Sequence, residues 1–336
     1  MLSLSSSPVI DFFRKVSATG KASLRCLLLA AVLVSFSGNG FAQEESSGNE
    51  VSEQTGEQAD QSDRFSPKSV SIPKPVDGSQ GVIYPRSVAI IGSQLYIVDL
   101  DLPGIWRREL EGDSPKLELY TPGTKLLRKA MNRPWCVTAH PTEGILIGDS
   151  ASREIYHAAS AGSELTALNG GWLGIPMALA VDASGENVFV GDAERRAVFR
   201  LPIGGGKPEL VCRVNARGFS FDGEGKLWAV TPDAEAVYRI DPETNEADVV
   251  VGERPYQFPN GIVWTGDEGF VTDGYGKAIW RFTEDGKTEK WYEGSPLKGP
   301  VGMTADDDSI YVADPQAKEV FRFDRKTKKP VGLLGK

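Results

Sequence analysis

Two arginines stand at equivalent positions of a repeating sequence pattern, where they could bind an anion. Arg86 and Arg217 belong to the first and fourth copies of the pattern. A guanidinium group pairs with a carboxylate or a phosphate through two parallel hydrogen bonds. The residues at the same position of all six copies form the candidate ligand-binding set: Arg86, Trp135, Met177, Arg217, Asn260 and Val301. The ligand class that we expect is an anionic small molecule or a protein partner.

The pattern that positions these residues recurs six times. Each copy contains an apolar strand that ends in Asp, or in Thr in the fourth copy, and the six ends are Asp99, Asp149, Asp192, Thr231, Asp273 and Asp314. Another apolar strand begins 14 to 16 residues earlier, after a Pro in five of the six copies. A third strand follows, with a β-branched, an aromatic and a basic residue at fixed positions, as in Val320, Phe321 and Arg322. A weaker outer strand completes each copy.

The spacing of the strand ends identifies the fold. They are 50, 43, 39, 42 and 41 residues apart. Four antiparallel strands in a repeat of about 42 residues are typical of a propeller blade. The sequence therefore predicts an all-β fold, a six-bladed β-propeller of four-stranded antiparallel blades, over residues 66–336. Segments 69–76 and 329–336 are the candidates to close the ring by pairing the two ends of the domain.

In such a ring, the residue after each Pro begins the innermost strand and lines the mouth of the central channel. The first and fourth blades face each other, so we expect Arg86 and Arg217 to converge. Nearby loops add further bases, which predict a basic face around the channel mouth: Lys125, Arg128, Lys129, Arg133, Arg195 and Arg196. Ordinary solvated loops are the alternative interpretation of these charges.

The recurrent Asp residues have a structural interpretation. A carboxylate at the end of a strand can accept hydrogen bonds from the backbone N–H groups of the following turn. The basic residue of the next strand is its expected ion-pair partner. An interaction repeated around the ring cannot mark a single active site, and the repeated aromatic residues are expected to pack between blades.

The N-terminal region lies outside the predicted propeller. Residues 1–42 combine four basic residues, an apolar run and a small-residue cleavage site, which together are typical of a signal peptide. Residues 43–65 carry seven acidic residues and one Arg, which predicts a disordered acidic linker. We therefore expect an exported, periplasmic or extracellular protein with no membrane span after cleavage. The remaining 32 basic and 38 acidic residues leave the propeller with a net charge of −6.

Composition excludes several kinds of site. The net charge of −9 for the whole chain argues against a nucleic-acid partner. Two His cannot supply a three-histidine zinc site, and we expect His140 and His157 to lie away from the channel mouth, where neither can serve a Ser-His-acid triad. After cleavage, Cys136 and Cys212 remain. They fall on the innermost strand of one blade and the outermost strand of the next, too far apart for a disulfide, so two free, buried thiols are expected.

Three blades resemble known families. Residues 175–201 and 300–324 resemble NHL-type repeats, and residues 258–282 resemble the corresponding blade of the gluconolactonase–regucalcin and strictosidine-synthase-like propellers. The second resemblance implies a divalent cation, calcium or another, held by a Glu, two Asn and an Asp. Asn260 matches one Asn, which makes it the single candidate metal ligand. The other three positions carry Arg86, Arg217 and Val301.

These observations favour a non-catalytic protein that binds its ligand at the channel mouth and acts as a monomer without a bound cofactor. A divalent-metal-dependent lactonase or hydrolase of the gluconolactonase type is the alternative. A structural module of a cell-surface assembly is a third interpretation, which differs from the first in lacking a small ligand.

Overall fold

The computed structural model describes residues 67–70, 81–101, 103–112 and 115–335. The predicted signal peptide (1–42) and acidic linker (43–65) lie outside these residues. Within the described part of the chain all regular secondary structure is β, and no helix is long and apolar enough to cross a membrane.

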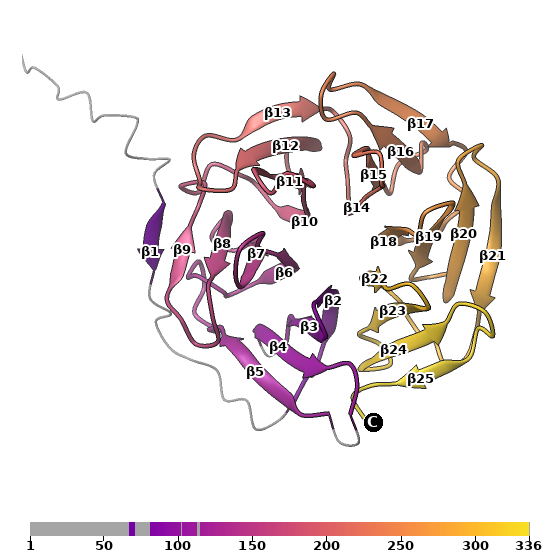
Figure 1. Ribbon diagram of the computed structural model, residues 1–336, viewed down its shortest axis with the longest axis horizontal. Coiled ribbons are helices and arrows are strands. Elements are labelled where there is room, and N and C mark those ends of the chain that lie inside the picture. Colours follow the sequence, from indigo (N-terminus) through magenta and orange to yellow (C-terminus); the bar gives the residue numbers. More distant parts are fainter. Residues whose placement is uncertain (1–66, 71–80, 102, 113–114, 336) are drawn as a thin grey trace, which may run out of the picture. The chain divides into compact units, whose positions relative to one another are not determined.

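Six antiparallel sheets are arranged in a ring, each built from four consecutive strands that run from the centre outwards (Figure 1). Blade one has β2 (Pro85–Ile91), β3 (Gln94–Asp99), β4 (Gly104–Glu109) and β5 (Leu117–Pro122). Blade two has β6 (Pro134–Ala139), β7 (Ile145–Asp149), β8 (Glu154–Ala158) and β9 (Leu165–Ala167). Blade three has β10 (Pro176–Val181), β11 (Asn187–Asp192), β12 (Ala197–Pro202) and β13 (Glu209–Cys212).

The second half of the chain repeats this arrangement. Blade four has β14 (Gly218–Phe221), β15 (Leu227–Val230), β16 (Val237–Ile240) and β17 (Ala247–Val251). Blade five has β18 (Pro259–Trp264), β19 (Glu268–Asp273), β20 (Ala278–Thr283) and β21 (Thr288–Glu293). Blade six has β22 (Met303–Ala305), β23 (Ser309–Asp314), β24 (Glu319–Asp324) and β25 (Pro330–Gly332). The predicted six-bladed β-propeller is confirmed, with the innermost strands of blades four and six beginning later than their sequence pattern suggested.

Within the described residues the two ends of the domain do not pair with each other, and the rest of the first candidate segment, 71–76, lies outside them. Strand β1 (Lys68–Val70) pairs instead with β9, as a fifth strand on the outside of blade two. Blade six is completed by its own β25, and a shared apolar cluster packs it against blade one, with Val301 and Tyr311 on one side and Val88 and Trp106 on the other. A Cβ added to Gly302 would lie 2.7 Å from the carbonyl oxygen of Arg86, so only glycine allows this close approach. Among the described residues, blades six and one are therefore held together by buried apolar side chains and not by a shared pair of strands.

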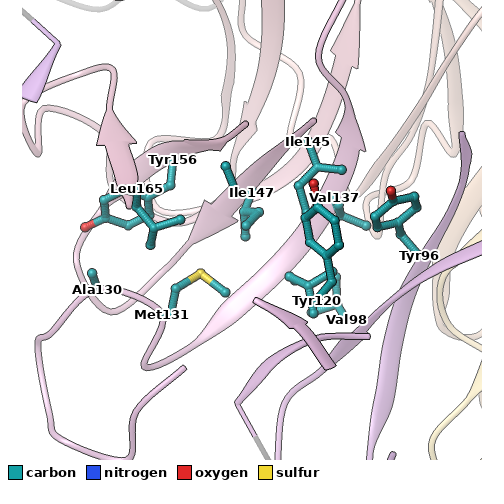
Figure 2. Packing of buried hydrophobic residues seen from close by; sticks show 12 residues of the cluster. Tyr96, Val98, Tyr120, Ala130, Met131, Val137, Ile145, Ile147, Tyr156 and Leu165 are labelled. Carbon is teal, nitrogen blue, oxygen red and sulfur yellow. The ribbon is translucent and has the colours of Figure 1, made fainter. Parts of the chain in front are cut away.

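Apolar side chains from neighbouring blades form the core. Between blades one and two the cluster combines Val98 and Tyr120 with Val137 and Ile147 (Figure 2). Each blade is apolar on both faces because both are covered by neighbours. The repeated aromatic residues take part in these clusters, as predicted; Tyr156 in blade two is 4% exposed.

The recurrent Asp carboxylates fasten the loops at one end of the ring. Asp192 accepts bonds from the N–H groups of Glu194 and Arg195 in the following turn, both at 3.1 Å, as predicted. It also accepts from Gly174 and Ile175, at 2.7 and 3.0 Å, in the loop that leads into β10. Equivalent bonds from backbone N–H groups are accepted by the carboxylates of Asp99, Asp149, Asp273 and Asp314. Each carboxylate therefore fixes the start of the innermost strand of its blade.

The ion pair expected between these Asp residues and the basic residue of the next strand does not form. Arg200 lies opposite Phe189, three residues before Asp192 along β11, and pairs with Glu209 at 3.2 Å. Three residues of strand span about 10 Å, beyond the reach of an ion pair in this register. Arg107 and Arg281 likewise pair with Glu118 and Glu268.

Candidate functional site

In four of the six blades, a β-bulge follows the proline of the repeating pattern. Pro85 pairs with Asp99 and Ser87 with Val98, which leaves Arg86 without a partner position. The same one-residue shift occurs at Trp135 in β6, at Met177 in β10 and at Asn260 in β18. A bulge turns a side chain out of the strand alternation and is often found beside a site. Here it accounts for side chains that face the channel.

Two cavities follow the centre of the ring. The inner chamber, about 220 Å³, is lined by residues from the innermost strands of all six blades. The outer chamber, about 700 Å³, is lined by the starts of these strands and by the loops around them. Five residues line both chambers and are called the neck: Arg86, Trp135, Met177, Arg217 and Asn260.

Val301, the sixth member of the predicted set, lines neither chamber. Its N–H donates to the carbonyl oxygen of Ala313 at 2.9 Å, and the N–H of Ala313 donates to the carbonyl oxygen of Gly302, also at 2.9 Å. Its side chain packs with Val88 and Tyr311 in the cluster between blades six and one. Blade six contributes Gly302 and Met303 to the inner chamber in its place.

Arg86 is a buried cation at the neck. It is 8% exposed, and its Nη2 donates to Oδ1 of Asn260 at 3.0 Å, across 174 residues of sequence. Its guanidinium carbon lies 4.7 Å from the ring centroid of Trp135, within cation–π range. Burial, together with the smaller effect of the nearby Arg217 charge, lowers the pKa of Arg86 from 12.5 to about 10. The group still carries its positive charge at neutral pH.

Arg217 supplies the second positive charge of the neck. Its Nη1 contacts the Sδ of Met177, a neutral and weak acceptor. Burial lowers the pKa of Arg217, an effect that Asp233 opposes and Arg196 reinforces. Among the described residues, no Asp or Glu lines either chamber. Two guanidinium groups therefore share a cavity whose wall carries no compensating carboxylate.

The neck does not fit a divalent cation. Calcium requires several oxygen ligands, usually with carboxylates among them. The side-chain oxygen of Asn260 already accepts a bond from Arg86, and a metal ion there would lie beside a positive charge. Within the described part of the chain, no group of three or more His, Cys, Asp or Glu side chains could hold a metal ion.

The other predicted bases divide into two groups. Arg128 and Arg133 line the outer chamber, and Lys125 and Lys129 are exposed on the same loop. Two further arginines are engaged with neighbouring side chains: Arg195 stacks on Trp172 at 4.0 Å, and Arg196 pairs with Asp233 at 2.8 Å.

The histidines and cysteines lie outside both chambers, except that Cys136 lines the inner one. His140, in the turn between β6 and β7, stacks on His157 of β8 with ring centroids 3.9 Å apart. Both thiols are free, as predicted, although Cys212 is half-buried rather than buried. Burial raises the pKa of the Cys136 thiol to about 12, which removes it as a nucleophile at neutral pH.

Sequence reasoning missed the apolar part of the outer chamber. Leu127 and Phe258 line it, together with Ile175 and Pro232. Phe258 immediately precedes a pattern proline, and Leu127 lies between basic residues in the longest loop. The available signal was the pair of leucines in an otherwise charged loop, but their direction depends on how that loop folds.

Comparisons with known proteins extend the description of the fold. No protein-family model and no curated protein matches the chain. A solved structure of virginiamycin B lyase from Staphylococcus aureus is 15% identical, with a TM-score of 0.58 over 80% of this chain and 88% of that one. The structure of a nidogen–laminin complex has 17% identity and a TM-score of 0.60 over 71% and 91%. A protein named from its family as a gluconolactonase has 14% identity and a TM-score of 0.57 over 80% and 94%.

These likenesses, all below 25% identity, show the fold alone. The chain is a six-bladed β-propeller, and solved structures of similar shape include a virginiamycin B lyase, a nidogen–laminin complex and a protein named as a gluconolactonase. The resemblance of the sequence to propellers of the NHL and gluconolactonase type is confirmed at the level of fold.

Proposed function

We propose that this protein binds a small anion at the neck and does not catalyse a reaction there. We also propose that it is exported and works outside the cytoplasm. The observation that carries the binding proposal is the pair Arg86 and Arg217, which face one cavity without a carboxylate on its wall. A buried charge that is not paired destabilises a protein, so its presence needs another reason. An anionic ligand supplies the missing countercharge.

The hydrogen-bonding chemistry of the neck supports a carboxylate or a phosphate. Arg86 uses one donor on Asn260 and keeps its other N–H groups, because a guanidinium has five. The guanidinium of Arg217 donates to the thioether of Met177, and the Asp233 carboxylate is near enough to raise the pKa of Arg217 but lines neither chamber. The two groups together can bind an anion through several charge-assisted bonds.

The proposal is tested by thermal unfolding with inorganic phosphate and with gluconate as probes. Both anions are expected to raise the melting temperature of the unaltered protein, and less so at high ionic strength. The variants Arg86→Gln and Arg217→Gln should lose this response. Arg200→Gln is the matched control, because Arg200 pairs with Glu209 away from the chambers. A response that persists in the double variant at the neck overturns the proposal, as does its absence in the unaltered protein.

The alternative is a metal-dependent lactonase or hydrolase of the gluconolactonase type. The shared fold favours it, and the composition of the neck counts against it. Calcium or zinc that stabilises the protein at micromolar concentration, together with hydrolysis of gluconolactone, would favour the enzyme. The virginiamycin B lyase from Staphylococcus aureus has a variant, described as catalytically inactive, in which alanine replaces a histidine. Neither histidine of this chain lines a chamber.

A further inference from the structure

Beyond the arginines, the outer chamber opens between apolar side chains. Leu127 and Phe258 contribute to its wall, and they are 82% and 39% exposed. Ile175 and Pro232 extend the apolar wall at the same level. Large apolar side chains that gather around a cavity while exposed to water mark a site that a ligand or partner covers. The chamber therefore joins a cationic floor to an apolar rim.

The loop that carries Leu127 is held in place by its own hydrogen bonds and by the core. The N–H of Thr124 donates to the carbonyl oxygen of Met131 at 3.2 Å, and Nδ2 of Asn132 donates to that of Thr124 at 3.1 Å. Met131 and Ala130 belong to the buried cluster between blades one and two (Figure 2). Because these contacts hold the base of the loop in place, the exposed position of Leu127 follows from the fold of the loop.

Phe258 is held on the other side of the rim. Its N–H donates to Oδ1 of Asp273 at 2.9 Å, which fixes the backbone just before the bulge at Asn260. Its ring stacks on Tyr275, with centroids 4.6 Å apart and planes 21° apart. Tyr275 is itself 66% exposed, so the pair presents an aromatic surface next to the neck.

We propose that the ligand is an amphipathic small molecule with an anionic head and an apolar tail. The head, a carboxylate or a phosphate, lies between Arg86 and Arg217, and the tail lies against Leu127 and Phe258. The head group rests on the proposed function above, and the tail is the new element. The volume of about 700 Å³ falls in the range typical of sites for small organic molecules. Charge complementarity selects a small anion as the occupant, since Arg128 and Arg133 add positive charge to the same wall.

The test is a calorimetric titration with unbranched carboxylates from acetate to octanoate, and with 1-octanol as the uncharged match. Each methylene that becomes buried is expected to tighten binding by about fourfold. Leu127→Gln should weaken octanoate binding and leave acetate unchanged. Leu126→Gln is the matched control, because Leu126 is exposed on the same loop but lines neither chamber. Arg86→Gln should weaken the binding of all carboxylates.

The two proposals fail in different ways. If acetate and octanoate bind with equal affinity and Arg86→Gln abolishes the binding of both, the proposal of an anion site stands and the proposal of an apolar tail is wrong. Octanol that binds as tightly as octanoate, unaffected by Arg86→Gln, overturns the anionic head. Binding to phosphatidylglycerol-containing vesicles that Leu126→Gln and Leu127→Gln weaken equally, without a chain-length effect in solution, would make the loop a membrane contact and overturn the tail proposal.

Discussion

Replacing Arg86 with Met tests whether this side chain contributes to the stability of the fold or to the binding of an anion. A buried arginine that serves the fold normally pairs with a carboxylate, and breaking such a pair costs about 3–5 kcal/mol. Arg86 contacts Asn260 and the face of Trp135 instead. We expect Arg86→Met to leave the free energy of unfolding within about 2 kcal/mol of its original value, by the balance of terms that follows.

The magnitude comes from opposing effects at one side chain. The lowering of the pKa of Arg86 from 12.5 to about 10 means that the fold disfavours its charged form by about 3 kcal/mol at neutral pH. The bond to Asn260 returns about 1.5–3 kcal/mol and the contact with Trp135 about 0.5–2 kcal/mol. Methionine keeps much of the apolar packing, so the terms nearly cancel.

Urea unfolding, with and without phosphate, measures the balance. The matched control is Arg239→Met, because Arg239 pairs with Asp222, Glu224 and Glu284 and its loss leaves three carboxylates without their cation. The control is expected to lose stability and to keep the response to phosphate, whereas Arg86→Met does the reverse. A loss above about 3 kcal/mol in Arg86→Met would place it with the paired arginines and refute the reasoning.

The same pKa predicts how the site depends on pH. The folded protein binds fewer protons at Arg86 than the unfolded chain between about pH 10 and pH 12.5, so this group's contribution to stability rises with pH across that window. Below that window its destabilising effect is fully present. Anion affinity changes in the opposite direction, because the charge that attracts the anion is lost as the pH rises through about 10. A phosphate affinity that is constant up to pH 11 contradicts this assignment.

Three further predictions concern other parts of the propeller. Asp192→Asn should lower the free energy of unfolding by about 2–4 kcal/mol in urea titrations, since the amide cannot accept all four backbone bonds; a change below 1 kcal/mol, by the same scale, would argue against the fastening role. The Cys136 thiol should resist labelling by a thiol reagent until the protein unfolds, because burial raises its pKa to about 12; rapid labelling of native protein contradicts its placement. Millimolar calcium should leave the melting temperature unchanged, and a clear increase would reopen the metal-dependent alternative.

Much of the fold is predictable because a blade is built from short-range pairings. The Asp at the end of the second strand and the Pro before the first mark a hairpin whose strands are close in sequence, as Pro134 and Asp149 are. Blade four departs at Ala216 and Thr231: the carboxylate of Asp233 accepts bonds from Nδ2 of Asn215, and β14 begins at Gly218, one residue later than expected. Where the recurrent residues change, the local geometry changes with them.

The candidate site was predictable in part. Five of the six proposed positions line both chambers because a bulge follows the pattern proline, or, at Arg217, because the strand begins just after it. Val301 does not, because its side chain packs in the apolar cluster between blades six and one. The period of the repeat contains no information about a one-residue shift in register, yet such a shift decides whether a side chain enters the channel or the core.

By itself, the sequence determined the number of blades, most of the strand ends and, in five of the six blades, the position that lines the chambers. Those features depend on local pairing and on alternation along a strand. The tertiary structure alone decided that Arg86 contacts Asn260, that Leu127 and Phe258 line the same chamber, and that apolar side chains pack blade six against blade one. These contacts join residues far apart in the chain, and their geometry follows from how six twisted sheets pack around a common centre.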